Sequence, residues 1–291
     1  MDLQTWQKSG KFFNYRDRGR IFYQEAGAGE ALLLLHGFPT ASWDWHKLWP
    51  GLTGRFRVLA PDFIGFGFSD KPRPYPYSIS DQAELVEDLL RQEQVEAVHV
   101  LAHDYGDTVA QELLARRLDR DQARQPGLRL LSMTLLNGGL FPETHRPRPI
   151  QRALISPFGA WLRPFLTKAA LRKNFHTIFG KNTPPTEPEI DAFYALMTHN
   201  GGVDIFHRLI RYMRERRRRR ARWVGALQHA ALPLRLIAGA ADPISGRHMA
   251  ERYAALVPHP DVVLLDGIGH YPQIEAPEQV LAHFLAFLAG A

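Results

Sequence analysis

The pentapeptide AHDYG (102–106) puts a carboxylate, Asp104, at a sharp turn between two regular segments. The apolar run AVHVLAH (97–103) precedes the turn, and a helix-forming pattern runs from Tyr105 to about residue 117. Small residues two positions to either side are typical of a nucleophile elbow, where backbone segments approach closely. A carboxylate in this position can instead cap the N-terminus of the helix. The turn alone therefore leaves two interpretations of Asp104 open.

Three further segments put polar groups at the ends of predicted strands. The loop LHGFP offers the backbone N–H of Phe38, which would form an oxyanion hole together with the N–H of Tyr105. Asp242 follows a strand-like run, at the strand end where open α/β sheets bind ligands. His270 follows the last strand-like run, in a glycine-rich loop.

Each of these features also has a simpler interpretation. HGFP can be an ordinary turn, Asp242 a helix cap, and His270 one of thirteen histidines, on a surface loop. Their order along the chain, however, is nucleophile, acid, histidine, which is the order in one group of hydrolases. Each of the features also follows the C-terminal end of a predicted strand, where such a site would lie. The sequence therefore favours a catalytic site with Asp104 as nucleophile, Asp242 as acid and His270 as base.

The elements that would position these residues alternate along the chain. After an opening hairpin of FFNYR and IFYQEAG, strand-like runs are expected at 31–37, 56–62, 97–103, 130–138, 233–239 and 262–267. Helical patterns are expected at 80–93, with Ser80 as N-cap, and at 105–117, 246–257 and 277–289. This alternation indicates an α/β fold with a mostly parallel, twisted sheet flanked by helices.

The alternation stops between residues 140 and 229. This range is rich in Pro, Arg and aromatic residues, and it shows no strand pattern. Helical stretches are expected near 150–156, 160–180, 187–199 and 203–222. We expect a helical lid here, inserted between two parts of one α/β core at 1–139 and 230–291.

The composition is that of a globular protein with one large hydrophobic core. A chain of 291 residues, 45% of them hydrophobic, suits one large core. The absence of cysteine excludes disulfides, thiolate zinc sites and a cysteine nucleophile. No metal-ligand spacing and no phosphate-binding glycine loop appears, so neither a metal nor a cofactor is expected. No signal-peptide pattern and no run of ~18 apolar residues appears, so a soluble, cytoplasmic protein is expected.

The net charge of +6 has a local origin. The segment from Arg208 to Arg222 holds nine arginines and one glutamate, so the rest of the chain is slightly acidic. This distribution does not indicate a nucleic-acid partner. We expect the run Arg216–Arg220 to be solvated, because no strong apolar face accompanies it; contact with anionic lipid headgroups at a membrane surface is the alternative. The oligomeric state is left open.

With these motifs in place, the chain resembles the α/β-hydrolases over nearly its whole length. HGFP, DFIGFGFSD (62–70), the Asp at the elbow and GHYPQIEAP resemble the epoxide hydrolase and haloalkane dehalogenase branch. HDYGDTVAQELL, NGGLFPETHRP, RRRARWVGAL and HYPQIE resemble the mesoderm-specific transcript proteins of animals and their bacterial relatives. The resemblance implies a small apolar substrate, an epoxide or a haloalkane, that forms an ester with Asp104; water activated by His270 then hydrolyses the ester.

The resemblance also implies that lid side chains decide between the two substrates. Epoxide hydrolases typically use lid tyrosines as acids toward the ring oxygen; Tyr212 matches such a position, and Tyr194 is the candidate for a second, although its context departs from the family motif. Haloalkane dehalogenases typically carry Trp after the nucleophile, where this chain has Tyr105, so Trp161 or Trp223 would have to replace it. Epoxide hydrolysis is therefore predicted, with dehalogenation as the alternative. A non-catalytic small-molecule binding protein is the alternative of another class.

Overall fold

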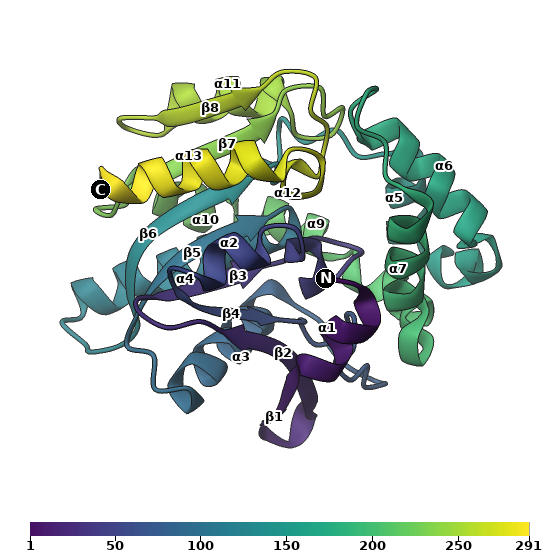
Figure 1. The fold of residues 1–291 in the computed structure, drawn as a ribbon, viewed down its shortest axis with the longest axis horizontal. Helices are drawn as coiled ribbons and strands as arrows, with labels where there is room; N and C mark the ends of the chain where they lie inside the picture. The colour runs from purple at the N-terminus through teal and green to yellow at the C-terminus, as the bar shows by residue number, and fades with distance from the viewer. Residues whose placement is uncertain (291) are drawn as a thin grey trace.

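The computed structural model describes residues 1–290, and its centre is one sheet of eight strands (Figure 1). The strand order is β1-β2-β4-β3-β5-β6-β7-β8. The pairs β1–β2 and β2–β4 are antiparallel, and every other neighbouring pair is parallel. The predicted opening hairpin and mostly parallel sheet are confirmed. The strands are β1 (Lys11–Tyr15), β2 (Gly19–Ala26), β3 (Ala31–Leu35), β4 (Arg57–Pro61), β5 (Ala97–His103), β6 (Arg129–Leu136), β7 (Leu234–Gly239) and β8 (Asp261–Leu265).

Helices flank the sheet and fill the range between β6 and β7. The helices outside that range are α1 (Leu3–Ser9), α2 (Trp49–Thr53), α3 (Ile79–Gln92), α4 (Tyr105–Gln122), α11 (Arg247–Leu256), α12 (Pro272–Glu275) and α13 (Pro277–Ala289), with short 3-10 turns at Arg16–Arg18 and Ser42–Trp45. Between β6 and β7 lie α5 (Pro149–Ile155), η3 (Gly159–Phe165), α6 (Lys168–Ile178), α7 (Glu187–Thr198), η4 (His199–Ile205), α8 (Phe206–Leu209), α9 (Tyr212–Arg218) and α10 (Arg220–Gln228).

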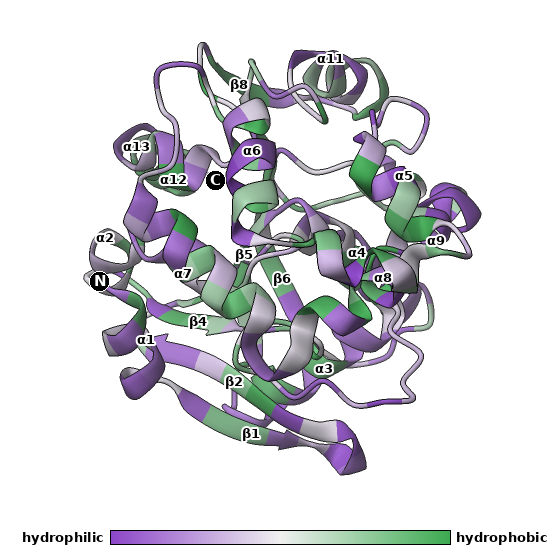
Figure 2. Ribbon diagram, turned by 90° about the vertical axis from the view of Figure 1, so that its right-hand side faces the viewer, coloured by the Kyte–Doolittle hydropathy of each residue, from purple (hydrophilic) through white to green (hydrophobic). Residues whose placement is uncertain are grey.

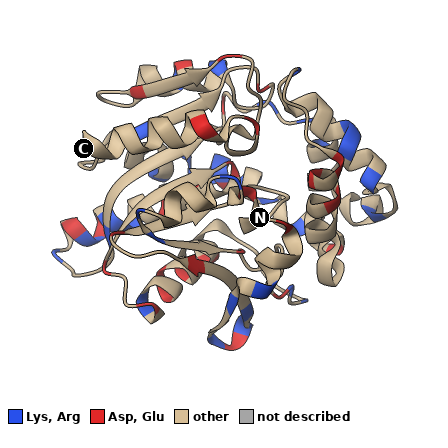
Figure 3. Ribbon diagram, in the orientation of Figure 1, with Lys and Arg blue, Asp and Glu red and all other residues tan. Residues whose placement is uncertain are grey.

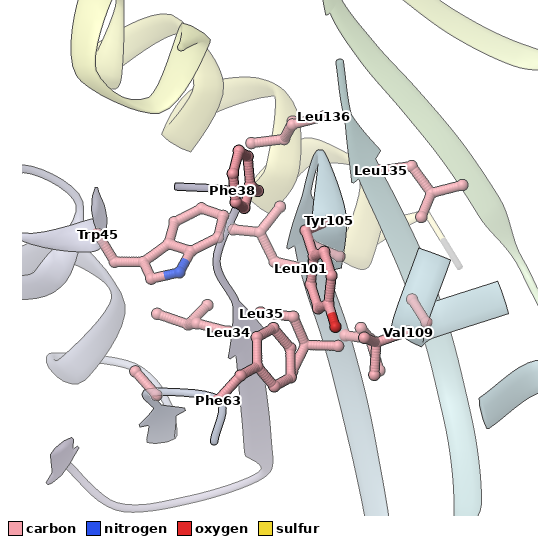
Figure 4. Close-up of a cluster of buried hydrophobic side chains, with 14 of the residues drawn as sticks. Leu34, Leu35, Phe38, Trp45, Phe63, Leu101, Tyr105, Val109, Leu135 and Leu136 are labelled. Atoms are coloured by element: carbon pink, nitrogen blue, oxygen red, sulfur yellow. The ribbon is translucent and has the colours of Figure 1, made fainter. Parts of the chain in front are cut away.

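The central strands form the hydrophobic core. All five residues of β3 are buried, as expected for a strand covered on both faces of a parallel sheet. Figure 4 shows Leu34 and Leu35 of this strand packed among Leu101, Phe63 and Tyr105. Figure 2 shows hydrophobic residues along the strands around β5, whereas α6 and α7 alternate between hydrophilic and hydrophobic segments, as surface helices do.

The helices α5, α6 and α7 lie together at one end of the sheet, on the right of Figure 1. Basic residues of α6 face acidic residues of α7 (Figure 3), and ion pairs join Lys168 to Asp191 and Arg172 to Glu187. The helix α10 differs from them because it packs along α4 of the core. The helical character expected for residues 140–229 is confirmed, and their role as a separate lid stays a prediction.

Several predicted boundaries need correction. The helix expected at 80–93 begins at Ile79, and its N-cap is Ser78, whose hydroxyl accepts the N–H of Asp81, not Ser80. The helix after Asp104 continues to Gln122, because its last turns are stabilised by charged pairs such as Arg117–Asp121 and not by an apolar stripe. The short helices α1 and α12 were not predicted, since segments of seven and four residues carry little periodicity.

Within residues 1–290, no helix combines the length and the apolar character that crossing a membrane requires.

Two glycines in packed helices provide a matched pair of substitutions. A Cβ at Gly106 in α4 would lie 2.3 Å from the backbone oxygen of Leu35, whereas a Cβ at Gly225 in α10 would meet no atom within 4 Å. We expect Gly106→Ala to lower the free energy of unfolding by about 1–3 kcal/mol, because α4 and β3 must separate. Gly225→Ala should raise it by about 0.5–1 kcal/mol, since alanine is the better helix former. Urea denaturation of both variants measures the difference; equal effects would contradict the close packing of α4 on β3.

Candidate active site

Asp104 occupies a strained turn between β5 and α4. Its φ of 45° and ψ of −99° lie outside the regions that non-glycine residues favour, and such strain persists only where the surroundings enforce it. Its backbone N–H donates to the carbonyl of Leu136 at 3.1 Å, which ties the turn to the end of β6. The Asp104 side chain makes no capping hydrogen bond to α4. Asp104 therefore stands at the N-cap position of α4, but its side chain does not cap the helix.

The backbone N–H of Phe38 lies beside the Asp104 carboxylate, and the backbone N–H of Tyr105 follows Asp104 in the chain. The N–H of Phe38, in the loop after β3, donates to Oδ2 of Asp104 at 3.1 Å. Tyr105 begins α4, where backbone N–H groups lack partners within the helix. Figure 4 shows the Tyr105 side chain among core residues, and its ring lies 5.5 Å from that of Phe63. The side chain of Tyr105 is therefore part of the core, and an oxyanion hole at this position stays a prediction that concerns only its backbone N–H.

His270 and Asp242 form a buried pair. The Nδ1 atom of His270 lies 2.7 Å from Oδ2 of Asp242. Asp242 also accepts hydrogen bonds from the Asn137 side-chain amide at 2.9 Å and from the Ser245 hydroxyl at 2.9 Å. The backbone N–H of His270 donates to the carbonyl of Ile178 at 2.8 Å, so the insertion helps to hold the loop that carries the imidazole. Asn137, which follows β6, thus helps to fix the orientation of the Asp242 carboxylate.

The charges of this pair shift both pKa values. Burial alone would raise the pKa of Asp242, but the imidazole of His270 and several hydrogen-bond donors lower it to about 2. Burial alone would lower the pKa of His270, but Asp242 and then Asp104 raise it to about 9. The free site therefore favours an ionised acid and a protonated histidine at neutral pH.

Arg216 is a site residue that the sequence analysis did not identify. Its side chain is only 2% exposed, so the expectation that the whole run Arg216–Arg220 is solvated is wrong for this residue, although Arg217, Arg218 and Arg219 are exposed. Its Nη2 lies 3.2 Å from the backbone oxygen of Asp104 and 3.7 Å from the carboxylate Oδ1.

The guanidinium of Arg216 is held by further contacts. Its Nε donates to the Thr108 hydroxyl at 2.7 Å, and its Nη1 is buried without a hydrogen-bond partner. It also lies over the Tyr212 ring, 4.7 Å from the centroid. One sequence signal could have indicated this: Arg216 follows Tyr212 by four residues and therefore shares its helix face.

Four aromatic residues of the insertion are candidates for a role at the site: Tyr194, Trp161, Tyr212 and Trp223. Of these, the structure brings only Tyr212 to Asp104. Its ring lies 4.8 Å from that of Tyr105, and its hydroxyl is buried without a partner. Burial and then the charge of Asp104 raise the pKa of Tyr212, so the phenol stays protonated.

The other three residues lie elsewhere. Tyr194 is half-buried on α7, and no hydrogen bond or ring contact within residues 1–290 joins it to Asp104. Trp223 is buried, but its indole N–H donates to Glu112 at 2.7 Å. Trp161 is 75% exposed to solvent. Neither tryptophan is available as a halide donor at Asp104, because one indole N–H already has a partner and the other side chain points into solvent.

A mostly apolar cavity extends from the site into the helical insertion. It reaches Phe38, His270 and Tyr271 at one end, and α5, α6 and the end of η3 form much of its wall. The apolar residues from these helices are Ile150, Leu154, Phe165, Leu171, Phe175 and Ile178. Within residues 1–290, no group of three or more His, Asp or Glu side chains is placed to hold a metal ion.

Neutralising either carboxylate should lower the pKa of His270 from about 9. We expect a larger decrease for Asp242→Asn than for Asp104→Asn, because Asp242 is the stronger of the two influences that raise it. The pair stabilises the fold fully between about pH 3.8 and pH 6.5, and this contribution is lost as the pH rises through about 9 or falls through about 2. NMR titration of the imidazole protons, assigned with His270→Gln, measures each pKa. An unchanged pKa in Asp104→Asn would show that Asp104 does not influence the ring.

Comparisons with known proteins agree with this geometry. A family model for the alpha/beta hydrolase fold matches residues 30–277. The mesoderm-specific transcript protein of Mus musculus is 45% identical over 299 residues, which cover 98% of this chain and 88% of that protein. A loop variant of a haloalkane dehalogenase from Bradyrhizobium elkanii has a TM-score of 0.80 at 21% identity, and the match covers 97% of this chain and 96% of that one. An epoxide hydrolase solved without ligand has a TM-score of 0.77 at 21% identity, covering 97% and 98%. The resemblance inferred from the motifs is therefore confirmed, and the chain belongs to the α/β-hydrolase fold family.

Proposed function

We propose that this α/β-hydrolase opens epoxides to vicinal diols, with Asp104 as the nucleophile. The observation that carries the proposal is the buried, unpartnered hydroxyl of Tyr212, near enough to Asp104 for the carboxylate to raise its pKa. A phenol that stays protonated beside a nucleophile can act as an acid toward the ring oxygen. The apolar cavity that reaches His270 suits a small apolar substrate, and the helical insertion serves as its lid.

In the first step, Oδ1 of Asp104 attacks a ring carbon, because Oδ2 already accepts the N–H of Phe38. The carbon–oxygen bond of the ring breaks, and the ring oxygen takes the proton of Tyr212. An alkyl ester and a phenolate result. Arg216 lies over the Tyr212 ring and stabilises this negative charge.

In the second step, the loss of the Asp104 charge removes one of the influences that raise the pKa of His270. The pKa of His270 falls, and the imidazolium releases its proton to solvent, which leaves a neutral imidazole that can act as the base. His270 then takes a proton from water, whose oxygen attacks the ester carbonyl. The N–H groups of Phe38 and Tyr105 stabilise the oxyanion, and the ester bond breaks. The departing alkoxide takes the proton from His270, and the new Asp104 carboxyl returns a proton to Tyr212. His270 regains its proton from solvent when the Asp104 carboxylate is formed again. No metal or cofactor enters the reaction.

Haloalkane dehalogenation through the same ester is the second candidate. The observation that favours it is Nη1 of Arg216, a buried charged donor without a partner that a halide would suit. Against it stand the positions of Trp161 and Trp223, away from Asp104. A protein that only binds small molecules would need none of the charge coupling between Asp104 and His270.

Mass spectrometry of His270→Gln tests the proposal and separates these candidates. This variant should form the ester but not hydrolyse it. Incubation with an aryl epoxide should add the mass of the whole epoxide, and the gain should be absent when Asp104→Asn is also present. A gain only from a bromoalkane, equal to its alkyl group, would establish dehalogenation instead. No adduct with either reagent would favour the binding protein.

Tyr212→Phe should lower the rate of epoxide opening about 10²–10⁴-fold, because the acid toward the ring oxygen is lost. Tyr194→Phe is the matched control and should leave the rate within a factor of two or so, since Tyr194 has no contact with Asp104. Single-turnover rates of ester formation measure both. Equal losses in the two variants would refute the role of Tyr212.

A further inference from the structure

Three large aromatic side chains are exposed together around η3. Phe158, Trp161 and Phe165 are 62%, 75% and 68% exposed, and the rings of Phe158 and Trp161 lie 5.5 Å apart. Among the described residues, Met1 and Phe12 are the other exposed large hydrophobic side chains, and they are less exposed, at 46% and 44%. We call Phe158, Trp161 and Phe165 the aromatic patch. Exposed aromatic groups gathered in one place mark an interaction surface.

The aromatic patch continues into the substrate cavity. Phe165 is exposed to solvent and also lines the cavity whose other end is His270. Leu166 and Thr167, between η3 and α6, and Ala170 of α6 extend the same wall. An apolar molecule held at the patch would therefore have a continuous apolar path toward the nucleophile.

The segment that carries the patch is strongly basic. Residues 146–181 contain eight Lys and Arg and no Asp or Glu. Carboxylates from elsewhere pair with Arg163, Lys168 and Arg172. Within residues 1–290, Arg152, Lys173 and Lys181 have no carboxylate partner. Figure 3 shows the basic residues of α6 on the outer side of the insertion.

We propose that this face docks on a bilayer that contains anionic phospholipids, with the cavity mouth turned toward the lipid. Trp and Phe side chains beside Lys and Arg are the combination that membrane interfaces favour. A second copy of the chain is a poorer occupant, because a two-fold contact would bring the two basic segments together. The proposal goes beyond the reaction at Asp104 and does not depend on it.

Trp161 provides a direct probe of docking. The other five tryptophans, Trp6, Trp43, Trp45, Trp49 and Trp223, are buried. Vesicles of phosphatidylcholine with phosphatidylglycerol, brominated in their acyl chains, should therefore quench the fluorescence of Trp161 if it enters the bilayer. We expect quenching and co-sedimentation with these vesicles. Binding to pure phosphatidylcholine should be weaker, since each basic residue near an anionic surface adds roughly fivefold to binding.

Variants separate the aromatic patch from other surfaces. Trp161→Ser with Phe165→Ser should reduce vesicle partition at least tenfold, and Arg152→Glu with Lys173→Glu should also reduce it. Phe12→Ser, on the exposed strand β1, is the matched control and should bind as the native chain does. Arg217→Glu tests the alternative that the exposed arginines of α9 make the contact. Circular dichroism confirms that each variant is folded.

Three results would overturn the proposal. The first is no partition to anionic vesicles. The second is a loss of binding that Phe12→Ser or Arg217→Glu reproduces while Trp161→Ser with Phe165→Ser has no larger effect. The third is self-association in sedimentation velocity that Trp161→Ser abolishes, which would make a second copy the occupant. Asp104→Asn should bind vesicles normally, so failure of the proposed chemistry and failure of docking are distinguishable.

Discussion

The close approach of α4 to β3 is the constraint on which the active site depends. Gly106 lies against the backbone of Leu35, and this contact allows the chain to turn sharply after β5 with Asp104 at a φ of 45°. The strained residue is held because its N–H is bonded to Leu136 and its side chain meets the N–H of Phe38. Three parallel strands thus bring Asp104, the N–H of Phe38 and the carbonyl of Leu136 together at one end of the sheet.

Charge balance is the second organising feature of the site. Four buried groups carry charge near one another: Asp104, Arg216, Asp242 and His270. Each charge has an opposite neighbour, because an isolated ion in this interior would be strongly destabilising. Any reaction that removes the charge of Asp104 therefore lowers the pKa of His270. This coupling supports the proposed two-step reaction, in which the imidazole becomes neutral, and so able to accept a proton, only after the first step.

The helical insertion between β6 and β7 contributes side chains and a backbone contact to the site. It supplies Tyr212 and Arg216 beside Asp104, and its Ile178 carbonyl holds the backbone of His270. It also forms the wall of the cavity and the exposed aromatic patch at the cavity's outer end. The part of the chain that departs from the simple βα alternation therefore forms much of the surroundings of Asp104 and of the cavity that reaches His270.

The sequence by itself determined the α/β class, most strand positions and the candidate residues Asp104, Asp242, His270 and Phe38. These follow from local signals: continuous apolar runs, tight turns and polar groups at strand ends. Only the tertiary structure decided that Arg216 is buried while its three neighbours are exposed, and that Tyr212 rather than Tyr194 lies beside Asp104. It also moved Trp161 from the site to the surface. Such outcomes depend on which face of each helix packs against the sheet, and a run of identical arginines or an isolated aromatic residue does not encode that face locally.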